Sequence, residues 1–171
     1  IISLSLAKLD INIPDFIKDA AINVIYENYN SYSPVDGYLE LKEAICVKFK
    51  RDNNLTYSSN QIVVSTGAKQ SIANVAQVLL NKGDEVLLPA PYWVSYSAIA
   101  TLSEATFVEI PSSIDTDFKI TPAQLEAAIT PKTKMIFFNS PNNPSGTIYS
   151  EAEYRALAKV LEKHPQIFIL S

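Results

Sequence analysis

Strand-length apolar runs alternate with helix-length segments from residue 61 to the end of the chain. The runs are residues 61–65 (QIVVS), 85–88 (EVLL), 105–110 (ATFVEI), 134–138 (KMIFF) and 166–170 (QIFIL). Strands that alternate with helices predict βαβ units and a parallel sheet. Short continuous apolar runs are typical of strands that are covered on both faces. We therefore expect an α/β fold in which three αβα layers enclose a mostly parallel sheet.

The segments between these runs carry helix signals. Apolar residues recur at helical spacing in residues 69–80, and residues 92–101 can also form a helix. Thr121 and Ser150 each begin a capping-box pattern, because a Gln or Glu stands three residues later. The two boxes predict one helix that begins after Thr121 and another that runs to about residue 163.

The first 60 residues have a different pattern. Helices are predicted over residues 14–29 and 38–51, where apolar residues recur on one side. The loop between them, residues 30–37, is rich in turn-forming residues. The chain begins at Ile1, without a methionine and without the pattern of a secretory signal, so we expect a processed product or a piece of a longer protein.

The glycines exclude three common motifs. No two of them have the spacing of the dinucleotide-binding fingerprint, the Walker phosphate loop or the hydrolase nucleophile elbow. The four glycines are Gly37, Gly67, Gly83 and Gly146. A function that depends on any of these motifs is therefore excluded.

Charge and cysteine content exclude further classes. The net charge of −4 argues against a nucleic-acid partner. Cys46, expected to pack within its helix, and His164, expected at the surface, are the sole residues of their types, so neither an internal disulfide nor a Cys/His zinc site can form. A reducing compartment, the cytoplasm, fits the single cysteine best. No apolar stretch reaches the roughly 18 residues of a membrane helix.

Ligands of open α/β sheets bind beyond the carboxyl ends of the strands, which directs attention to the segments after Ser65, Leu88, Phe138 and Leu170. The first of these segments, residues 65–71 (STGAKQS), begins a helix. The free amides and the dipole of a helix start favour an anion, and the lysine in this segment adds positive charge. The alternative is a tight strand-to-helix turn with a solvated lysine.

The loops after two further strands hold rigid aromatic and polar groups. Residues 89–93 carry Trp93, the single tryptophan, which can stack on a planar ligand or pack in the core. Residues 139–146 carry Asn142 and Asn143 between prolines. Their amides can be held toward a ligand, or the segment is an Asx/Pro turn. The constrained position at this end of the sheet favours a ligand-binding role.

Four segments of the chain stand in a familiar order. They are Tyr32-x-x-Val35-Asp36-Gly37, Ser65-Thr66-Gly67-Ala68-Lys69-Gln70, Pro91-Tyr92-Trp93 and Asn142-Asn143-Pro144-Ser145-Gly146. Together they resemble the class I and II aminotransferases, which are fold-type-I pyridoxal-phosphate enzymes, and the nearest likeness is to bacterial aspartate aminotransferases. The resemblance implies that residues 13–171 form a pyridoxal-phosphate-binding large domain, incomplete at its C-terminal end, and that residues 1–12 are an N-terminal segment.

The resemblance also implies how the cofactor, pyridoxal 5′-phosphate, would be held. The backbone at Gly67, Ala68 and Lys69 would cradle its phosphate. Trp93 would stack on the pyridine ring, and Asn143 would donate a hydrogen bond to the phenolic oxygen of that ring.

Further implied roles concern the partner subunit and the substrate. Tyr32 would reach the cofactor phosphate of a second subunit, which implies a homodimer with shared active sites. Ala7, Trp93 and Asn143 would lie beside the substrate. Two residues depart from the family's pattern, because Ala7 stands where the family has a glycine and Ile13 where it has a helix-capping threonine.

The family's catalytic groups are not identifiable in this chain. The sequence ends at Ser171, where the family continues with the aspartate that pairs with the pyridine nitrogen. The Schiff-base lysine and the arginine that holds the substrate carboxylate come later still, and Lys69 belongs to the phosphate loop. The resemblance implies transfer of an amino group between an amino acid, expected to be aspartate, and a 2-oxo acid. We expect the 171-residue chain alone to be inactive.

Alternative functions remain beside this interpretation. One keeps the fold and the cofactor but changes the reaction, for example to β-elimination. Another is a non-catalytic fragment that binds the cofactor or supports dimerisation. A nucleotide-binding α/β domain is disfavoured by the absent glycine-rich motifs and by Asn142-Asn143-Pro144. Neither a nucleic acid nor a membrane is expected as a partner.

Overall fold

The structure is a computed structural model of the chain, and it describes residues 11–171. The chain divides into two compact units, one that ends at Val63 and one that extends from Val64 to Ser171. Ala7 and most of the predicted N-terminal segment, residues 1–12, lie outside the described residues. No helix within residues 11–171 is both long and apolar enough to cross a bilayer.

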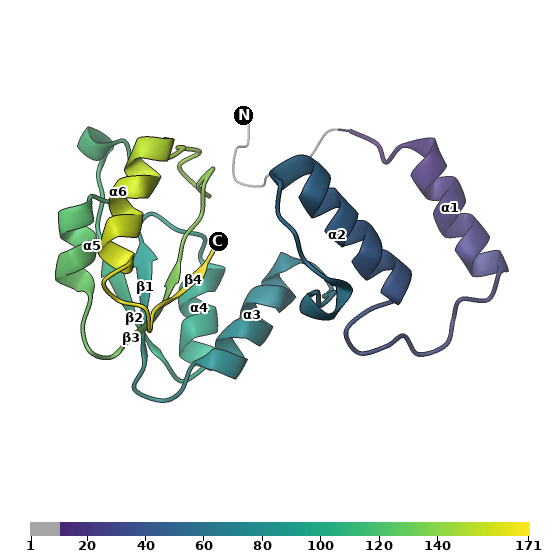
Figure 1. Ribbon diagram of the computed structural model, residues 1–171, viewed down its shortest axis with the longest axis horizontal. Helices are drawn as coiled ribbons and strands as arrows, with labels where there is room; N and C mark the ends of the chain where they lie inside the picture. Colours follow the sequence, from purple (N-terminus) through teal and green to yellow (C-terminus); the bar gives the residue numbers. More distant parts are fainter. Residues whose placement is uncertain (1–10) are drawn as a thin grey trace, which may run out of the picture. The chain divides into compact units, whose positions relative to one another are not determined.

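The first unit contains the two predicted helices. They are α1 (Asp15–Tyr26) and α2 (Leu39–Asn53), and a single 3-10 turn, η1 (Ser59–Gln61), follows them (Figure 1). Helix α1 ends three residues earlier than predicted, and Asn28 then adopts a positive φ of 60° that a helix cannot continue through. Pro14 holds the N-cap position of α1, which has no side-chain cap.

The second unit is built around a four-stranded parallel sheet in the order β2-β1-β3-β4. The strands are β1 (Glu85–Pro89), β2 (Thr106–Ile110), β3 (Thr133–Phe137) and β4 (Phe168–Leu170). The helices are α3 (Ala68–Leu79), α4 (Ser95–Leu102), α5 (Pro122–Ala128) and α6 (Glu151–Leu161), with a 3-10 turn, η2 (Ile114–Thr116), before α5.

Helices cover both faces of this sheet (Figure 1). In β1, Val86 and Leu88 pack on one face with α3 and α4, while Leu87 packs on the other with α5 and α6. In β3, Met135 and Ile136 divide between the two faces in the same way. This alternation follows from the two-residue period of a strand, and all of these side chains are fully buried. The predicted three-layer α/β architecture with a parallel sheet is confirmed.

One predicted strand is absent. Residues 61–65 begin at the end of η1 and continue without regular structure, and no described strand pairs with them. β-branched residues favour a strand only where a neighbouring strand supplies the hydrogen-bonded ladder. This run instead crosses the division between the two units, and Ile62 is its only buried residue.

Both predicted capping boxes are present. The Thr121 hydroxyl accepts a hydrogen bond from the Gln124 amide, and the Ser150 hydroxyl accepts one from the Glu153 amide, each at 3.3 Å. The reciprocal bonds from the amides of the two capping residues to the Gln124 and Glu153 side chains are 2.9 and 2.6 Å long. Helix α4 begins at Ser95 rather than at Tyr92, so the Pro91-Tyr92-Trp93 motif forms a loop.

His164 is less exposed than the sequence predicted. Its side chain is only a quarter exposed, and Nε2 is buried without a hydrogen-bond partner within the described residues. The nearest carboxylate oxygen, on Glu126, is 3.9 Å away. The turn after α6 places this side chain against α5, so His164 is not the surface residue that the sequence predicted.

Candidate functional site

The start of α3 offers free backbone amides. Gly67 is the N-cap residue, and its φ of 84° and ψ of 162° lie in a region that is essentially restricted to glycine. Its own amide donates to the Ser65 carbonyl oxygen at 2.8 Å. Within residues 11–171, the amides of Ala68 and Lys69 donate to no acceptor, and both residues are exposed. Two of the three amides in the predicted phosphate cradle are thus open to an anion.

Lys69 and Trp93 meet at this helix start. The Lys69 ammonium lies 4.8 Å from the centre of the Trp93 ring, a distance typical of a cation–π contact. Trp93 is half-buried and packs edge-to-face on Tyr96, which packs in the same way on Phe137 of β3. The indole is therefore anchored to the core on one side while part of it stays accessible beside α3. The two alternatives for Trp93, packing and ligand contact, are compatible with each other.

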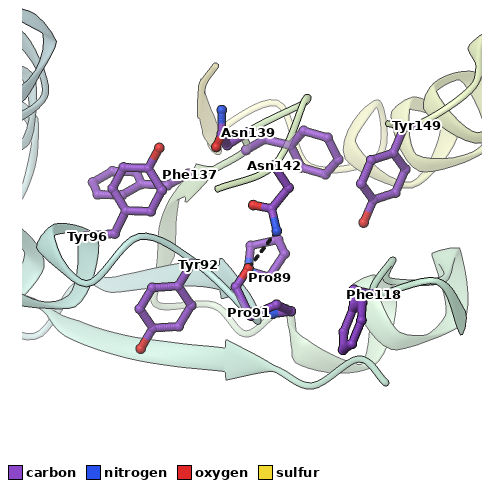
Figure 2. A pocket seen from close by; sticks show the side chains of 10 residues that line it. Pro89, Pro91, Tyr92, Tyr96, Phe118, Phe137, Asn139, Asn142 and Tyr149 are labelled. Carbon is purple, nitrogen blue, oxygen red and sulfur yellow. Dashed lines mark hydrogen bonds between the residues drawn. The ribbon is translucent and has the colours of Figure 1, made fainter. Parts of the chain in front are cut away.

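A small pocket lies where β1 and β3 end (Figure 2). Its walls come from the loop after β1, from the end of β3 and from residues 139–149. The pocket is mainly aromatic, and its polar side chains include Asn139 and Asn142. The Asn142 side-chain amide donates to the Pro91 carbonyl oxygen at 2.9 Å, shown as the dashed line in Figure 2. This bond joins the two loops that carry Trp93 and Asn143.

Asn143 is exposed. Its backbone amide donates to the Asn139 side-chain oxygen at 2.9 Å. Its own side-chain amide makes no hydrogen bond within the described residues, so both its donor and its acceptor remain available. The role predicted for Asn143 stays a prediction.

Tyr92 lines the pocket, and the sequence had suggested no role for it. Its hydroxyl donates a hydrogen bond to the Glu109 carboxylate on β2. Burial is the main cause that raises the pKa of Tyr92, and the bond to Glu109 raises it further. The contact ties the loop before Trp93 to the neighbouring strand.

The first unit holds the remaining predicted motif. Tyr32 is fully exposed in this chain. The Asp36 carboxylate accepts a hydrogen bond from the buried Lys42 ammonium of α2, which is the main cause that lowers the pKa of Asp36. Gly37 has a φ of 98° and donates to the Pro34 carbonyl oxygen at 3.0 Å. Asp36 and Gly37 therefore shape the loop.

The structure brings together part of the predicted site. Lys69 and Trp93 are in contact, and the Pro91–Asn142 bond brings the Asn143 loop beside the Trp93 loop. Tyr32 belongs to the first unit. The sequence predicted that the side-chain amide of Asn142, like that of Asn143, could be held toward a ligand, and the resemblance gave Asn142 no role. In the structure the Asn142 side-chain nitrogen instead donates to the Pro91 carbonyl oxygen and the Ser145 hydroxyl. The position of Asn142 beside Asn143 in a proline-bounded loop was the one available signal.

Comparison with known proteins decides the family. The family model described as aminotransferase class I and II matches residues 1–171. The chain belongs to this family. It is 49% identical over all 171 residues to the aspartate/prephenate aminotransferase of Cereibacter sphaeroides and 44% identical over 170 residues to an aspartate aminotransferase of Rhizobium meliloti. It spans only 43% and 42% of the lengths of these two relatives.

Solved aminotransferase structures share the fold. The aspartate aminotransferase from Rhizobium meliloti superposes with a TM-score of 0.94 and 43% identity, over 97% of this chain and 42% of that one. The Thermus thermophilus aspartate aminotransferase with maleate gives a TM-score of 0.89 and 35% identity, over 93% of this chain and 42% of that one. The resemblance seen in the sequence motifs is confirmed. The chain corresponds to a part of the aminotransferase fold.

Proposed function

We propose that the protein to which this chain belongs is a pyridoxal-phosphate-dependent aminotransferase. It transfers an amino group between an amino acid, in the first instance aspartate, and a 2-oxo acid. Membership of the aminotransferase family supports the reaction class. The names of the similar proteins, aspartate/prephenate and aspartate aminotransferase, support the substrates. Because the chain spans less than half of those proteins, the activity is proposed for the whole protein.

The residues at the start of α3 fit a phosphorylated planar cofactor. The free amides of Ala68 and Lys69 suit a phosphate, because they point out of an exposed helix N-terminus that carries a partial positive charge. The Trp93 ring beside Lys69 offers an aromatic surface. The Lys69–Trp93 contact at this helix start is the observation that carries the proposal, because it joins an anion site to a ring-stacking site.

Each residue has a defined part in holding the cofactor. The amides of Ala68 and Lys69 bind the phosphate, with Gly67 giving the backbone its turn into the helix. Trp93 orients the ring, and the free side-chain amide of Asn143 donates to the ring's phenolic oxygen. When bound, pyridoxal phosphate supplies an electron-withdrawing ring that stabilises negative charge on the substrate's α-carbon.

Two measurements on the full-length protein test this function. Absorbance titration should show saturable pyridoxal phosphate binding. Lys69→Ala should weaken it, because this variant keeps the backbone amide but removes the positive charge and the contact with Trp93. A coupled assay with aspartate and 2-oxoglutarate should show oxaloacetate formation, and prephenate should be tried as the amino acceptor because the Cereibacter sphaeroides relative is named for it. Cofactor binding without any amino transfer would favour the alternative of β-elimination, which release of pyruvate from suitable β-substituted amino acids would detect.

We also propose a homodimer in which Tyr32 contacts the cofactor phosphate of the second subunit. The full exposure of Tyr32 in the single chain leaves its hydroxyl available for such a contact. Sedimentation of the full-length protein should give a dimer. Tyr32→Phe should keep the dimer and weaken cofactor binding, because only the hydroxyl is removed. A monomer at every concentration would contradict the proposal.

A cytoplasmic location is proposed from the single Cys46 alone.

A further inference from the structure

The loops after β1 and β3 are held together by one side chain. β1 and β3 are neighbours in the sheet, so their carboxyl ends lie side by side. The Asn142 side-chain amide crosses between the two loops and donates to the Pro91 carbonyl oxygen at 2.9 Å, across 51 positions of the sequence (Figure 2). The same nitrogen also donates to the Ser145 hydroxyl at 2.8 Å within its own loop.

The backbone of Asn142 is fixed as firmly as its side chain. Its amide donates to the Thr147 carbonyl oxygen at 2.9 Å, and its carbonyl oxygen accepts from the Gly146 amide at 2.7 Å. The hydroxyls of Ser145 and Thr147 are 2.8 Å apart and close the loop further. Asn142 is half-buried. These bonds leave its side chain little freedom to turn away from Pro91.

The chemistry of the bond requires an amide at position 142. The Pro91 carbonyl oxygen can only accept, so the side chain opposite it must donate. Aspartate has the shape of asparagine, but as a carboxylate it presents only acceptors and would repel this oxygen. Alanine leaves the oxygen without its partner, which is costly for a partly buried polar group.

The Asn142–Pro91 bond lies close to two of the predicted cofactor-binding residues in the sequence. Pro91 is two residues before Trp93 along one loop, and Asn142 is directly before Asn143 along the other. We propose that Asn142 is a positioning residue that sets the spacing between Trp93 and Asn143. This inference rests on the proposed function, in which those two side chains hold pyridoxal phosphate. Asn142 itself touches neither cofactor nor substrate in this role.

The first experiment needs no cofactor. Peptide-resolved hydrogen exchange is measured on the cofactor-free full-length protein and on Asn142→Asp and Asn142→Ala. Within residues 89–93 the Ala90 amide is the one that donates a backbone hydrogen bond among the described residues, to the Ile110 carbonyl oxygen at 2.9 Å. In both variants this amide should exchange about tenfold faster, because the lost bond at Pro91 loosens the loop that holds it. The control is Asn139→Asp, which adds the same charge to the same loop but keeps the acceptor for the Asn143 amide. It should leave exchange in residues 89–93 unchanged.

The second experiment uses pyridoxal phosphate itself. Its dissociation constant is measured by absorbance for the wild type and for both Asn142 variants, well below their thermal unfolding midpoints. The constant should rise about tenfold, the loss expected for one hydrogen bond to a partly buried carbonyl oxygen. The near-ultraviolet circular dichroism of Trp93, isolated by subtracting the matching Trp93→Phe spectra, should change in the same two variants.

The outcomes separate this inference from the function on which it rests. Wild-type affinity in both Asn142 variants, with a lower unfolding midpoint only, would overturn the positioning role and leave the proposed function intact. Unchanged exchange in residues 89–93 would overturn it as well, since the loops would then be held by other contacts. A wild-type protein that binds no pyridoxal phosphate would overturn the proposed function and the inference together.

Discussion

At the scale of single residues, backbone geometry and local contacts decide the chemistry of the candidate site. Gly67 adopts a conformation that other residues rarely reach, and a Cβ at this position would meet nothing within 4 Å. Gly67→Ala is therefore expected to destabilise the protein through strain rather than through a clash, by about 1–3 kcal/mol. Chemical denaturation of the full-length protein measures this. Ala68→Gly, in the first turn of the same helix, should cost only about 0.5–1 kcal/mol, and equal costs for the two variants would contradict the argument.

Trp93 contacts both the hydrophobic core and the candidate site. It rests on Tyr96 and extends toward Lys69. Trp93→Ala should weaken pyridoxal phosphate binding by about 1 kcal/mol or somewhat more, the range of aromatic stacking energies. Trp93→Phe should retain most of the affinity because it keeps an aromatic face. Equal affinity of the alanine variant and the wild type, in a fluorescence or absorbance titration, would make Trp93 a purely structural residue.

At the scale of elements, the N-terminus of α6 couples helix formation to pH. The pKa of Glu153 lies below the ordinary glutamate value of 4.5, chiefly because its carboxylate accepts a hydrogen bond from the Ser150 backbone amide. The Ser150 hydroxyl and Lys119 lower the pKa further. A carboxyl whose pKa is lowered in the folded state contributes stability above its unfolded pKa. That contribution disappears as the pH falls through the folded value.

The variant Glu153→Gln isolates the charge, because glutamine can keep the capping box. Its unfolding temperature should be lower than that of the wild type at pH 7. The difference should shrink as the pH falls below about 4.5, where the wild-type carboxyl also loses its charge. Thermal scans from pH 7 to pH 3 measure this. A difference that stays constant across the range would show that the charge makes no contribution.

At the scale of the whole molecule, β4 presents an apolar edge. Within residues 11–171 it is the last strand of the sheet, and Phe168 and Ile169 are 44% and 57% exposed. An apolar hollow of about 110 Å³ lies beside it, lined by residues of α5, β3, α6 and β4. Exposed apolar strand edges pair with other chains. The isolated 171-residue chain should therefore self-associate in light scattering, and Ile169→Lys should reduce this more than Gln166→Lys, which adds the same charge outside β4.

Catalytic competence is also a property of the whole molecule. Amino transfer needs a lysine that bonds the cofactor covalently and then moves a proton. The resemblance assigns no lysine of this chain to that role. The isolated chain mixed with pyridoxal phosphate and aspartate should form no keto acid at enzymatic rates, and borohydride reduction should label no single lysine stoichiometrically. Robust turnover by the isolated chain would contradict the motif assignment.

The extent of sequence-based prediction differs from one element to another. The capping boxes at Thr121 and Ser150 were predictable, because each is closed by residues only three positions apart. The prediction of a strand at residues 61–65 was wrong, because a local apolar run carries no information about a pairing partner. The start of α4 was placed three residues too early, because Tyr92 and Trp93 suit a helix locally. In the structure both are committed to contacts with Glu109, Lys69 and Tyr96.

The sequence by itself determined the αβα layering and the family, because periodicity, caps and ordered motifs are short-range signals. The residues that would meet a cofactor stay a prediction from those motifs. Only the tertiary structure decided which of those residues meet. The Lys69–Trp93 contact and the Asn142–Pro91 bond join segments that are 24 and 51 positions apart. Such contacts depend on the parallel pairing of β1 with β3 and on the packing of α3 against that sheet. The role of Asn142 is visible only there, because its bonding partner is a backbone carbonyl, which every residue of a sequence possesses equally.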